Sequence, residues 1–529
     1  MRTPAMTKEA VYMSSSEFRR TLPARADQEQ QRKLAKELIA AYRRGDDEAR
    51  RRIRAELPNK PEIALGDAQF VLAREYGFES WRALKEHIEA KAREARPPIE
   101  RFKSAVQRGD AKALRRVLES NAEVRAAINQ PIFGFDSPAL VAMGDEPEIA
   151  DVLLEFGADP NRGSDWWAGS FHPLYGASPR VAERLLAAGA VPDACAAAHL
   201  DRIDLLSHMI AEKASRVNER GGDGQTPLHF ARSRAAVDLL LASGADIDAR
   251  DVDHRSTAAE WMLSDSDDPA KSRLDLARYL VERGASADIF LVAALGLTDR
   301  ALALVAANPS VLELRTGQGE YAEKPPSSYH VYLWAIGHNM TPLQTAARFK
   351  QFETLAALAR VASPEQRLLL ACHEADAGAA RAIVRDNPGI VERLIGADRR
   401  ALTDEAWAAN GPAVELMLEL GFDPAAPAVI GPKGGNALHC AAWEGSVECV
   451  SALLRYPSGR ALLNSREEVY NGTPLSWCCH GSGNCGRREA NHAEVARLLL
   501  EAGEVLNPDL ESCSDEMQAV LDAALARQA

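Results

Sequence analysis

The sequence predicts an all-α solenoid of stacked helix–turn–helix units, preceded by a small helical module. Two observations carry this prediction. A helix start made of a capping residue, a proline and a leucine recurs along the chain, as at Thr226-Pro227-Leu228. A helix end built around glycine also recurs, as at Gly244, and the ends lie about 33 residues apart or at multiples of that spacing. The chain has 529 residues, more than one compact core accommodates, so a repeat array also accounts for its length.

The recurring helix starts have a simple physical basis. The Thr226 hydroxyl caps the helix, and Pro227 fills the first helical position, where a missing N–H costs nothing. Leu228 and Ala231 lie three residues apart and therefore share one face. Related starts occur at Ser137-Pro138, His172-Pro173, Thr341-Pro342, Asn436-Ala437 and Thr473-Pro474.

The recurring helix ends place glycine after the last helical turn. Glycine adopts the left-handed conformation that closes a helix at little cost. The spacing from Gly157 to Gly189 is 32 residues and from Gly284 to Gly421 is 137 residues, which corresponds to one and to about four units of the repeat. The other ends of this kind lie at Gly244 and Gly503.

The two ends of the chain carry helices of a different pattern. Before the array we expect a helix at 32–42, with 50–57 as its extension, and helices at 67–76 and 81–92, with Gly77 closing the helix at 67–76. Pro97-Pro98 marks the boundary, so residues 1–97 form the module and 98–506 form the array. Residues 507–529 contain a last amphipathic helix that caps the open end of the array.

The repeat resembles a known family. The run Thr226-Pro227-Leu228-His229-Phe230-Ala231, followed by a helix pair and Gly244-Ala245-Asp246, is similar to ankyrin repeats. The resemblance implies about 12 units, several of them degenerate, and hydrogen bonds from His229 and His439 to the backbone between units. Residues 65–85 are similar to a helical module that precedes ankyrin arrays in many bacterial proteins, which implies a bacterial source.

Charge and composition narrow the function. Residues 1–100 carry 21 Lys+Arg and 17 Asp+Glu, and the remaining 429 residues carry a net charge of −17. An acidic array repels nucleic acids and membrane surfaces and suits a protein partner, especially a basic one. We find no apolar run long enough to span a membrane and no secretory signal. We therefore expect a cytoplasmic protein with reduced thiols.

Three insertions between repeat helices are the predicted contact sites for a partner, because insertions map to loops that often line the binding face. Residues 161–171 carry adjacent tryptophans, of which we expect one to be buried and one exposed. Residues 315–339 are rich in aromatic residues, and 329–336 suggest a finger of β-strand. Residues 257–284 contain an acidic loop. The candidate contacts are Trp166, Trp167, Asp265, Asp267, Asp268, Tyr321, Tyr329, Tyr332 and Trp334. For each insertion the plainer alternative is a solvated loop or a cover over the core.

Other chemistry receives less support. Cys478, Cys479, His480 and Cys485, with His492 nearby, supply enough soft ligands for zinc, but adjacent cysteines on a helix point apart. Packing inside a repeat is the competing interpretation. The cluster Arg50-Arg51-Arg52-Ile53-Arg54 raises nucleic-acid attachment through the module as a second alternative, although the module's net charge is small.

No phosphate-binding loop, dinucleotide fingerprint, nucleophile elbow or zinc-protease motif occurs in the sequence. We therefore expect neither catalysis nor a cofactor, a resident metal or a small-molecule substrate. The most economical hypothesis is a non-catalytic scaffold that binds another protein through its turns, its inner helices and its insertions.

Overall fold

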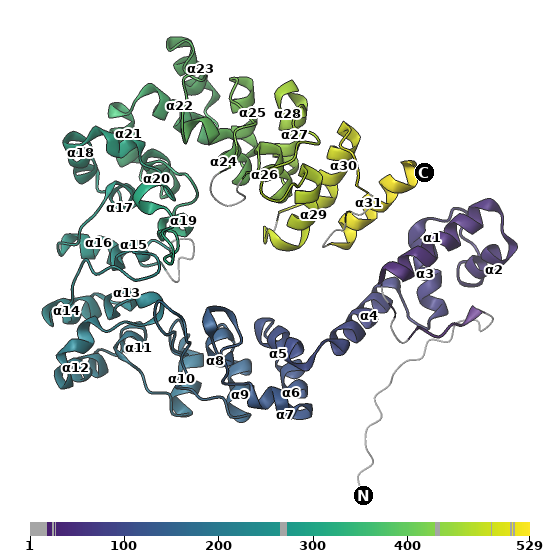
Figure 1. The fold of residues 1–529 in the computed structure, drawn as a ribbon, viewed down its shortest axis with the longest axis horizontal. Helices are drawn as coiled ribbons and strands as arrows, with labels where there is room; N and C mark the ends of the chain where they lie inside the picture. Colours follow the sequence, from purple (N-terminus) through teal and green to yellow (C-terminus); the bar gives the residue numbers. More distant parts are fainter. Residues whose placement is uncertain are drawn as a thin grey trace, which may run out of the picture. The chain divides into compact units, whose positions relative to one another are not determined.

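The computed structural model confirms the all-α repeat fold. It describes residues 18–23, 26, 28–264, 272–428, 434–487, 489–507, 510 and 514–528. Within these residues every regular element is a helix, and β-pairing is limited to isolated bridges such as Phe133 with Ser137. Consecutive short helices pair along the chain, as Figure 1 shows.

The described residues divide into two compact units. The first runs to Gly163 and also contains Ala177–Ala190, whereas the second contains Ser164–Gly176 and everything from Val191 onward. The helices of the first unit are α1 (Gln28–Arg44), α2 (Asp47–Glu56), α3 (Leu65–Glu75), α4 (Trp81–Ala95), α5 (Pro98–Gln107), α6 (Ala111–Ser120), α7 (Ala122–Ala126), η2 (Gly134–Asp136), α8 (Ala139–Ala142), α9 (Pro147–Glu155) and α10 (Pro179–Ala187).

The second unit holds the rest of the array and the last helix. Its first part contains α11 (Ala194–His199), α12 (Ile203–Glu212), η3 (Ala214–Asn218), η4 (Gly222–Gly224), α13 (Pro227–Phe230), α14 (Arg234–Ala242), α15 (Ala258–Trp261), α16 (Leu274–Glu282), α17 (Ile289–Leu295), α18 (Thr298–Ala307), η5 (Pro309–Glu313), η6 (Gly319–Tyr321) and α19 (Tyr332–Ala335). Its second part contains α20 (Pro342–Arg348), α21 (Phe352–Val361), α22 (Pro364–His373), α23 (Ala377–Asp386), η7 (Asp398–Arg400), α24 (Ala401–Trp407), α25 (Gly411–Glu419), α26 (Ala437–Trp443), α27 (Val447–Arg455), α28 (Pro457–Arg460), α29 (Pro474–Asn484), α30 (His492–Ala502) and α31 (Asp515–Gln528).

The N-terminal helices form a small core of their own. Leu38, Ile53 and Val71 are buried there against one another's helices. Arg52, one of the arginines of the basic cluster, donates two hydrogen bonds to Glu75, at 2.7 and 2.8 Å. That arginine therefore holds α2 against α3, which leaves less of the cluster's charge for a nucleic-acid backbone.

Thr-Pro pairs begin three of the repeat helices. Thr341 and Thr473 adopt extended backbone and accept hydrogen bonds at Oγ1 from the N–H groups of Gln344 and Ser476, and Pro342 and Pro474 follow them as the first helical residues. Thr226 and Pro227 also begin α13, with Leu228 buried behind them, but here the threonine hydroxyl lies 3.0 Å from Nδ1 of His229. At His172-Pro173 the expected helix is absent, and the chain forms only a turn.

Two histidines link successive repeats by hydrogen bonds to the backbone. Nδ1 of His229 lies 3.1 Å from the Thr226 N–H nitrogen, and Nε2 lies 3.1 Å from the carbonyl oxygen of Ser256 in the next unit. His439 makes the equivalent contact with the Gly472 carbonyl at 3.1 Å. Since the carbonyl can only accept, Nε2 carries the proton in each. Burial lowers the pKa of His229 to about 4, which keeps the ring neutral.

The glycine ends close the helices as the repeat pattern predicts. Gly157, Gly244 and Gly421 have φ values of 90, 92 and 90°, which lie in the left-handed region that glycine adopts without steric cost. Gly189, Gly284 and Gly503 also have positive φ. The helix expected near the C-terminus is α31, and Met517 and Leu521 bury its apolar face.

The core of the second unit consists of two successive clusters. The first spans residues 194–362 and includes Leu240, Phe290 and Leu343. The second spans residues 368–524 and includes Leu438 and Leu453. Such a chain of local cores is what stacked repeats produce, because each unit buries its apolar face only against its neighbours. Among the described helices, none combines the length and the apolar composition that a membrane crossing requires.

Candidate functional site

The first predicted insertion is a compact loop that holds its two tryptophans in place. The Ser164 N–H donates to the Phe171 carbonyl at 3.0 Å, and the Phe171 N–H donates to the Ser164 hydroxyl at 2.8 Å. Trp166 is half-buried, and its Nε1–H donates to Asp223 at 3.1 Å. Trp167 is 45% exposed. One ring is thus anchored to the scaffold, while its neighbour faces solvent.

Glycines in the turn at 221–224, in the next repeat, allow this loop to approach that turn closely. A Cβ on Gly221 would lie 2.7 Å from the Tyr175 hydroxyl, and one on Gly222 would lie 2.4 Å from the Phe171 ring. A Cβ on Gly169 would lie 2.0 Å from the Gly221 carbonyl oxygen. The insertion therefore packs directly against the Gly-Gly-Asp-Gly run at 221–224, where larger side chains would clash with it.

The second predicted insertion behaves differently from the expectation. Residues 329–336 contain the single helical turn α19 in place of a β-strand. Tyr321 and Tyr332 are only 3% and 0% exposed, so neither can contact a partner, and their assignment as contact residues is wrong. The physical reason is Asp288, which accepts both hydroxyls, from Tyr321 at 2.8 Å and from Tyr332 at 2.9 Å.

The environment of Asp288 raises the pKa of that carboxyl to about 6. Desolvation by the surrounding protein is the main cause, and the negative charge of Glu260 adds to it, while the Leu291 N–H and the Tyr321 hydroxyl act in the opposite direction. Asp288 also caps α17 by accepting from the Leu291 N–H at 2.8 Å. The aromatic cover over the core is therefore fastened to the start of a repeat helix.

The remaining aromatic residues of the second insertion meet the turn at 251–254. Trp334 is 55% exposed, and its ring centroid lies 4.9 Å from that of His254. The Tyr329 carbonyl lies 3.0 Å from Nδ1 of His254, and Tyr329 itself is half-buried. The Ser328 N–H donates to Asp253 at 3.0 Å. The second insertion thus folds back over a unit 75 residues earlier in the chain.

The two insertions converge on one surface. Trp166 of the first insertion donates a hydrogen bond to Asp223, and Trp334 of the second insertion packs against His254. Nε2 of His254 lies 3.8 Å from Asp223, which brings the two contacts together. We call Trp166, Trp167, Asp223, His254 and Trp334 the insertion surface. The acidic loop with Asp265, Asp267 and Asp268 lies outside the described residues.

A second aromatic surface lies on three helices near the C-terminus, α24, α26 and α29. Trp407 ends α24, Trp443 ends α26 and Trp477 lies on α29, with ring centroids 6.3 and 6.1 Å apart along this tryptophan row. His480 stacks against Trp443 at 5.1 Å. The row lines a cleft of about 610 Å³, whose wall also includes Tyr470, Ser476 and Arg466.

Trp407 and Trp443 belong to no insertion and to no motif that indicated a site. The signal was the pattern Ala-Leu-x-x-x-Ala-Trp, which occurs at both 401–407 and 437–443. Equal register in successive repeats places side chains on the same face of neighbouring units. A single tryptophan at the end of a short helix is ordinary, so only the repeat register connects the two residues.

The proposed cysteine–histidine site does not assemble. Sγ of Cys478 is buried and donates to the His492 carbonyl at 3.3 Å, and it lies 3.9 Å from Sδ of Met517. Cys479 is buried as well, whereas His480 is exposed against Trp443. Burial raises the pKa of the Cys478 thiol, which opposes the thiolate that zinc requires. Packing explains this segment.

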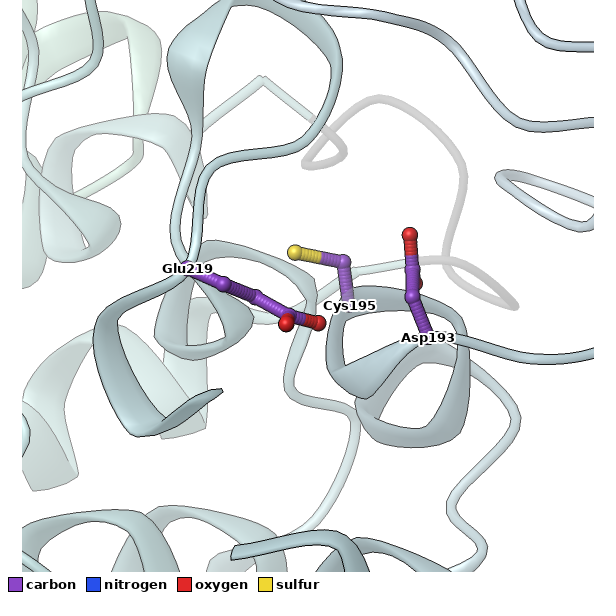
Figure 2. Close-up of side chains that lie close together, drawn as sticks. All are labelled: Asp193, Cys195 and Glu219. Carbon is purple, nitrogen blue, oxygen red and sulfur yellow. The ribbon is translucent and has the colours of Figure 1, made fainter. Parts of the chain in front are cut away.

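Two other groups of side chains bring possible metal ligands within 4.8 Å of one another in the described residues. Figure 2 shows the first, Asp193, Cys195 and Glu219 at the start of α11. Asp193 accepts from the Ala196 N–H at 2.7 Å, and Glu219 accepts from the Ala194 N–H at 2.5 Å. Burial raises the pKa of the Cys195 thiol. These carboxylates therefore serve as helix caps beside a neutral thiol.

The second group is Asp223, Asp253 and His254, of which Asp223 and His254 belong to the insertion surface. Asp223 and Asp253 are 7% and 2% exposed. Burial raises the pKa of the Asp223 carboxyl to about 6; the nearby imidazole of His254 opposes the rise, and the charge of Asp253 adds to it. The insertion surface therefore combines exposed aromatic rings with a buried, negatively charged centre.

Comparison with protein families identifies the repeat. Residues 379–509 match the family described as ankyrin repeats in three copies, and residues 223–252 match a single ankyrin repeat. Among curated proteins no match was found. The chain therefore contains ankyrin repeats in these two segments. Ankyrin repeats are in general protein–protein interaction modules, and proteins built from them are typically non-catalytic.

Proposed function

We propose that this chain is a non-catalytic, cytoplasmic scaffold that binds another protein through the insertion surface. The observation that carries the proposal is the convergence of two insertions that leave Trp167 and Trp334 45% and 55% exposed. Tryptophan buries a large area on binding at a low entropic cost, and it is enriched among the residues that dominate binding energies. The Trp167 ring contacts Trp166, and the Trp334 ring contacts His254. Because these neighbours already restrict the two rings, the rings lose little conformational freedom when a partner binds.

The tryptophan row supplies a second contact surface for the same function. Trp407 and Trp443 are half-buried on successive inner helices, and the cleft beside them is large enough to accept side chains of a partner. The acidic charge of the array favours a basic partner. The described cysteines are free thiols, which supports a reducing compartment.

The test is capture of the partner with the wild-type chain, followed by affinity measurements with the purified partner. Two double variants separate the surfaces: Trp167→Ala with Trp334→Ala, and Trp407→Ala with Trp443→Ala. True anchors should each cost about 2 kcal/mol or more in binding. Phe352→Ala on α21, where the side chain is 67% exposed, is the matched control and should leave the affinity unchanged.

The outcomes discriminate between the surfaces. Weaker binding by the first double variant alone supports the insertion surface, and weaker binding by the second alone assigns the interaction to the tryptophan row. A partner whose affinity both double variants leave intact would show that neither surface is the binding site. Circular dichroism of every variant should match that of the wild type, since all the substituted side chains are half-buried or exposed.

A further inference from the structure

Asp223, Asp253 and His254 present three ligand atoms to one point. Nε2 of His254 lies 3.4 Å from Oδ2 of Asp253 and 3.8 Å from Oδ2 of Asp223. The groups come from two successive units, Asp223 from the turn before α13 and the other two from the turn before α15. Asp251 adds a third buried carboxylate close by, and its oxygens accept the N–H groups of His254 and Ser256.

The protonation of His254 follows from its hydrogen bond. Its Nδ1 lies 3.0 Å from the Tyr329 carbonyl, which can only accept, so Nδ1 carries a proton. In the neutral ring Nε2 then carries a lone pair, and this lone pair faces carboxylate oxygens of Asp223 and Asp253. That arrangement is repulsive unless a cation, either a proton on Nε2 or a metal ion, lies between the three atoms.

The distances favour the metal ion. A charge-assisted hydrogen bond from a protonated imidazole to a carboxylate is about 2.7–2.9 Å long, and both separations here are longer. A tetrahedral ion with ligands at about 2.0–2.2 Å has ligand-to-ligand edges of about 3.4 Å. One edge matches this length, and the other exceeds it by a few tenths of an ångström.

A shell of hydrogen bonds already orients the three ligands. Ser328 donates to Asp253 through its N–H at 3.0 Å and its hydroxyl at 3.1 Å. The Trp166 Nε1–H donates to the other oxygen of Asp223, at 3.1 Å. A backbone carbonyl holding the second nitrogen of a histidine is the usual support of a metal-bound imidazole. In the group around Cys195, by contrast, the carboxylates are occupied by the N–H groups of α11.

We propose that Asp223, Asp253 and His254 form a binding site for a divalent transition-metal ion, of which Zn²⁺ is the representative. One imidazole with two carboxylates is a ligand set that suits such ions, whereas Ca²⁺ and Mg²⁺ prefer oxygen alone. The three ligands leave a position for water or for a donor atom of another molecule. The ion would tie two repeat turns together beneath Trp166 and Trp334, and metal binding itself does not depend on the proposed partner.

The experiment titrates the chelator-treated full chain with Zn²⁺ by calorimetry and records the visible spectrum with Co²⁺. We expect one equivalent of Zn²⁺ and a tetrahedral Co²⁺ spectrum without a thiolate charge-transfer band. His254→Asn keeps a donor for the Tyr329 carbonyl but removes Nε2, so it should abolish stoichiometric binding. Trp166→Phe removes the hydrogen bond to Asp223 and should weaken binding about 10- to 100-fold.

Matched variants exclude the other sources of metal binding. His208→Asn changes an exposed histidine beside Glu212, Cys478→Ser with Cys485→Ser removes the cysteine segment, and Asp193→Asn tests the group in Figure 2. All three should bind Zn²⁺ as the wild type does. The proposal is overturned if the wild type binds no stoichiometric Zn²⁺, if His254→Asn binds it unchanged, or if the Co²⁺ spectrum shows thiolate coordination.

Discussion

Asp288 is the residue that holds the aromatic side chains of the second insertion against the core. Its two carboxylate oxygens each accept a tyrosine hydroxyl, from Tyr321 and Tyr332, and one of them also caps α17. Aromatic residues that sequence patterns place on a binding loop are thereby drawn into the core. Burial beneath these residues desolvates the carboxylate and raises its pKa to about 6, above its usual value of 3.8, although the hydrogen bonds from Leu291 and Tyr321 oppose the rise.

A pH dependence follows from that shift. Because the folded-state pKa of Asp288 is raised, the folded chain binds more protons than the unfolded chain between about pH 4 and pH 6. Its local stability should therefore fall as the pH rises through this window and stay constant above it. Relative to Asp288→Asn, the wild type should lose at most about 3 kcal/mol of protection between pH 4 and pH 7.

Native-state hydrogen exchange of the α17 amides measures this difference, after correction for the intrinsic pH dependence of exchange. Asp193→Asn alters the cap of α11 at a carboxylate that accepts one tyrosine hydroxyl, from Tyr175, instead of two, and it provides a comparison at another helix start. Equal pH profiles for the wild type and Asp288→Asn would show that the carboxylate is not desolvated as the structure indicates.

At the scale of elements, close approach between the first insertion and the 221–224 turn is the feature most open to test. Gly222→Ala should cost about 1–3 kcal/mol, because the new Cβ meets the Phe171 ring at 2.4 Å. Phe171→Ala should relieve most of that cost, so the double variant should be less destabilised than the two single changes predict. Exchange of the amides at 164–171 gives the measurement.

Gly66→Ala is the control for a methyl group added to glycine. A Cβ at Gly66 meets nothing within 4 Å, and the residue lies in α3, so the substitution should stabilise its helix slightly. Additive effects of Gly222→Ala and Phe171→Ala would contradict the contact between the insertion and the turn.

The elements that the sequence predicted correctly have local signals. Thr341 with Pro342 and Thr473 with Pro474 begin helices because the cap and the fixed φ act within one turn. The end at Gly244 is equally local. No helix forms at His172-Pro173, although Nδ1 of His172 accepts from the Leu174 N–H at 3.1 Å, because the neighbouring Phe171 and Tyr175 pack against glycines of the next repeat.

The candidate site was predictable only in part, because it depends on distant contacts. The sequence indicated Trp166, Trp167 and Trp334 as residues of insertions, and the structure leaves them half-buried or exposed. It did not indicate that His254 would contact a carbonyl 75 residues later in the chain. Separations of that size carry no periodic signal, so the convergence of the insertions appears only in three dimensions.

At the scale of the whole molecule, stability should be local to each core cluster. Residues 194–362 and 368–524 of the second unit bury their apolar side chains in two successive clusters, and a repeat array distributes stability over neighbouring units. Leu240 on α14 and Leu453 on α27 are both 0% exposed, one in each cluster. Leu453→Ala should therefore lower protection in the second cluster by about 2–5 kcal/mol, while amides of the first cluster keep theirs. Leu240→Ala should do the reverse, and hydrogen exchange followed by mass spectrometry reports both clusters in one experiment. Uniform loss of protection in both variants would instead mean that the second unit unfolds as one cooperative body, with the interfaces between repeats stronger than the repeats themselves.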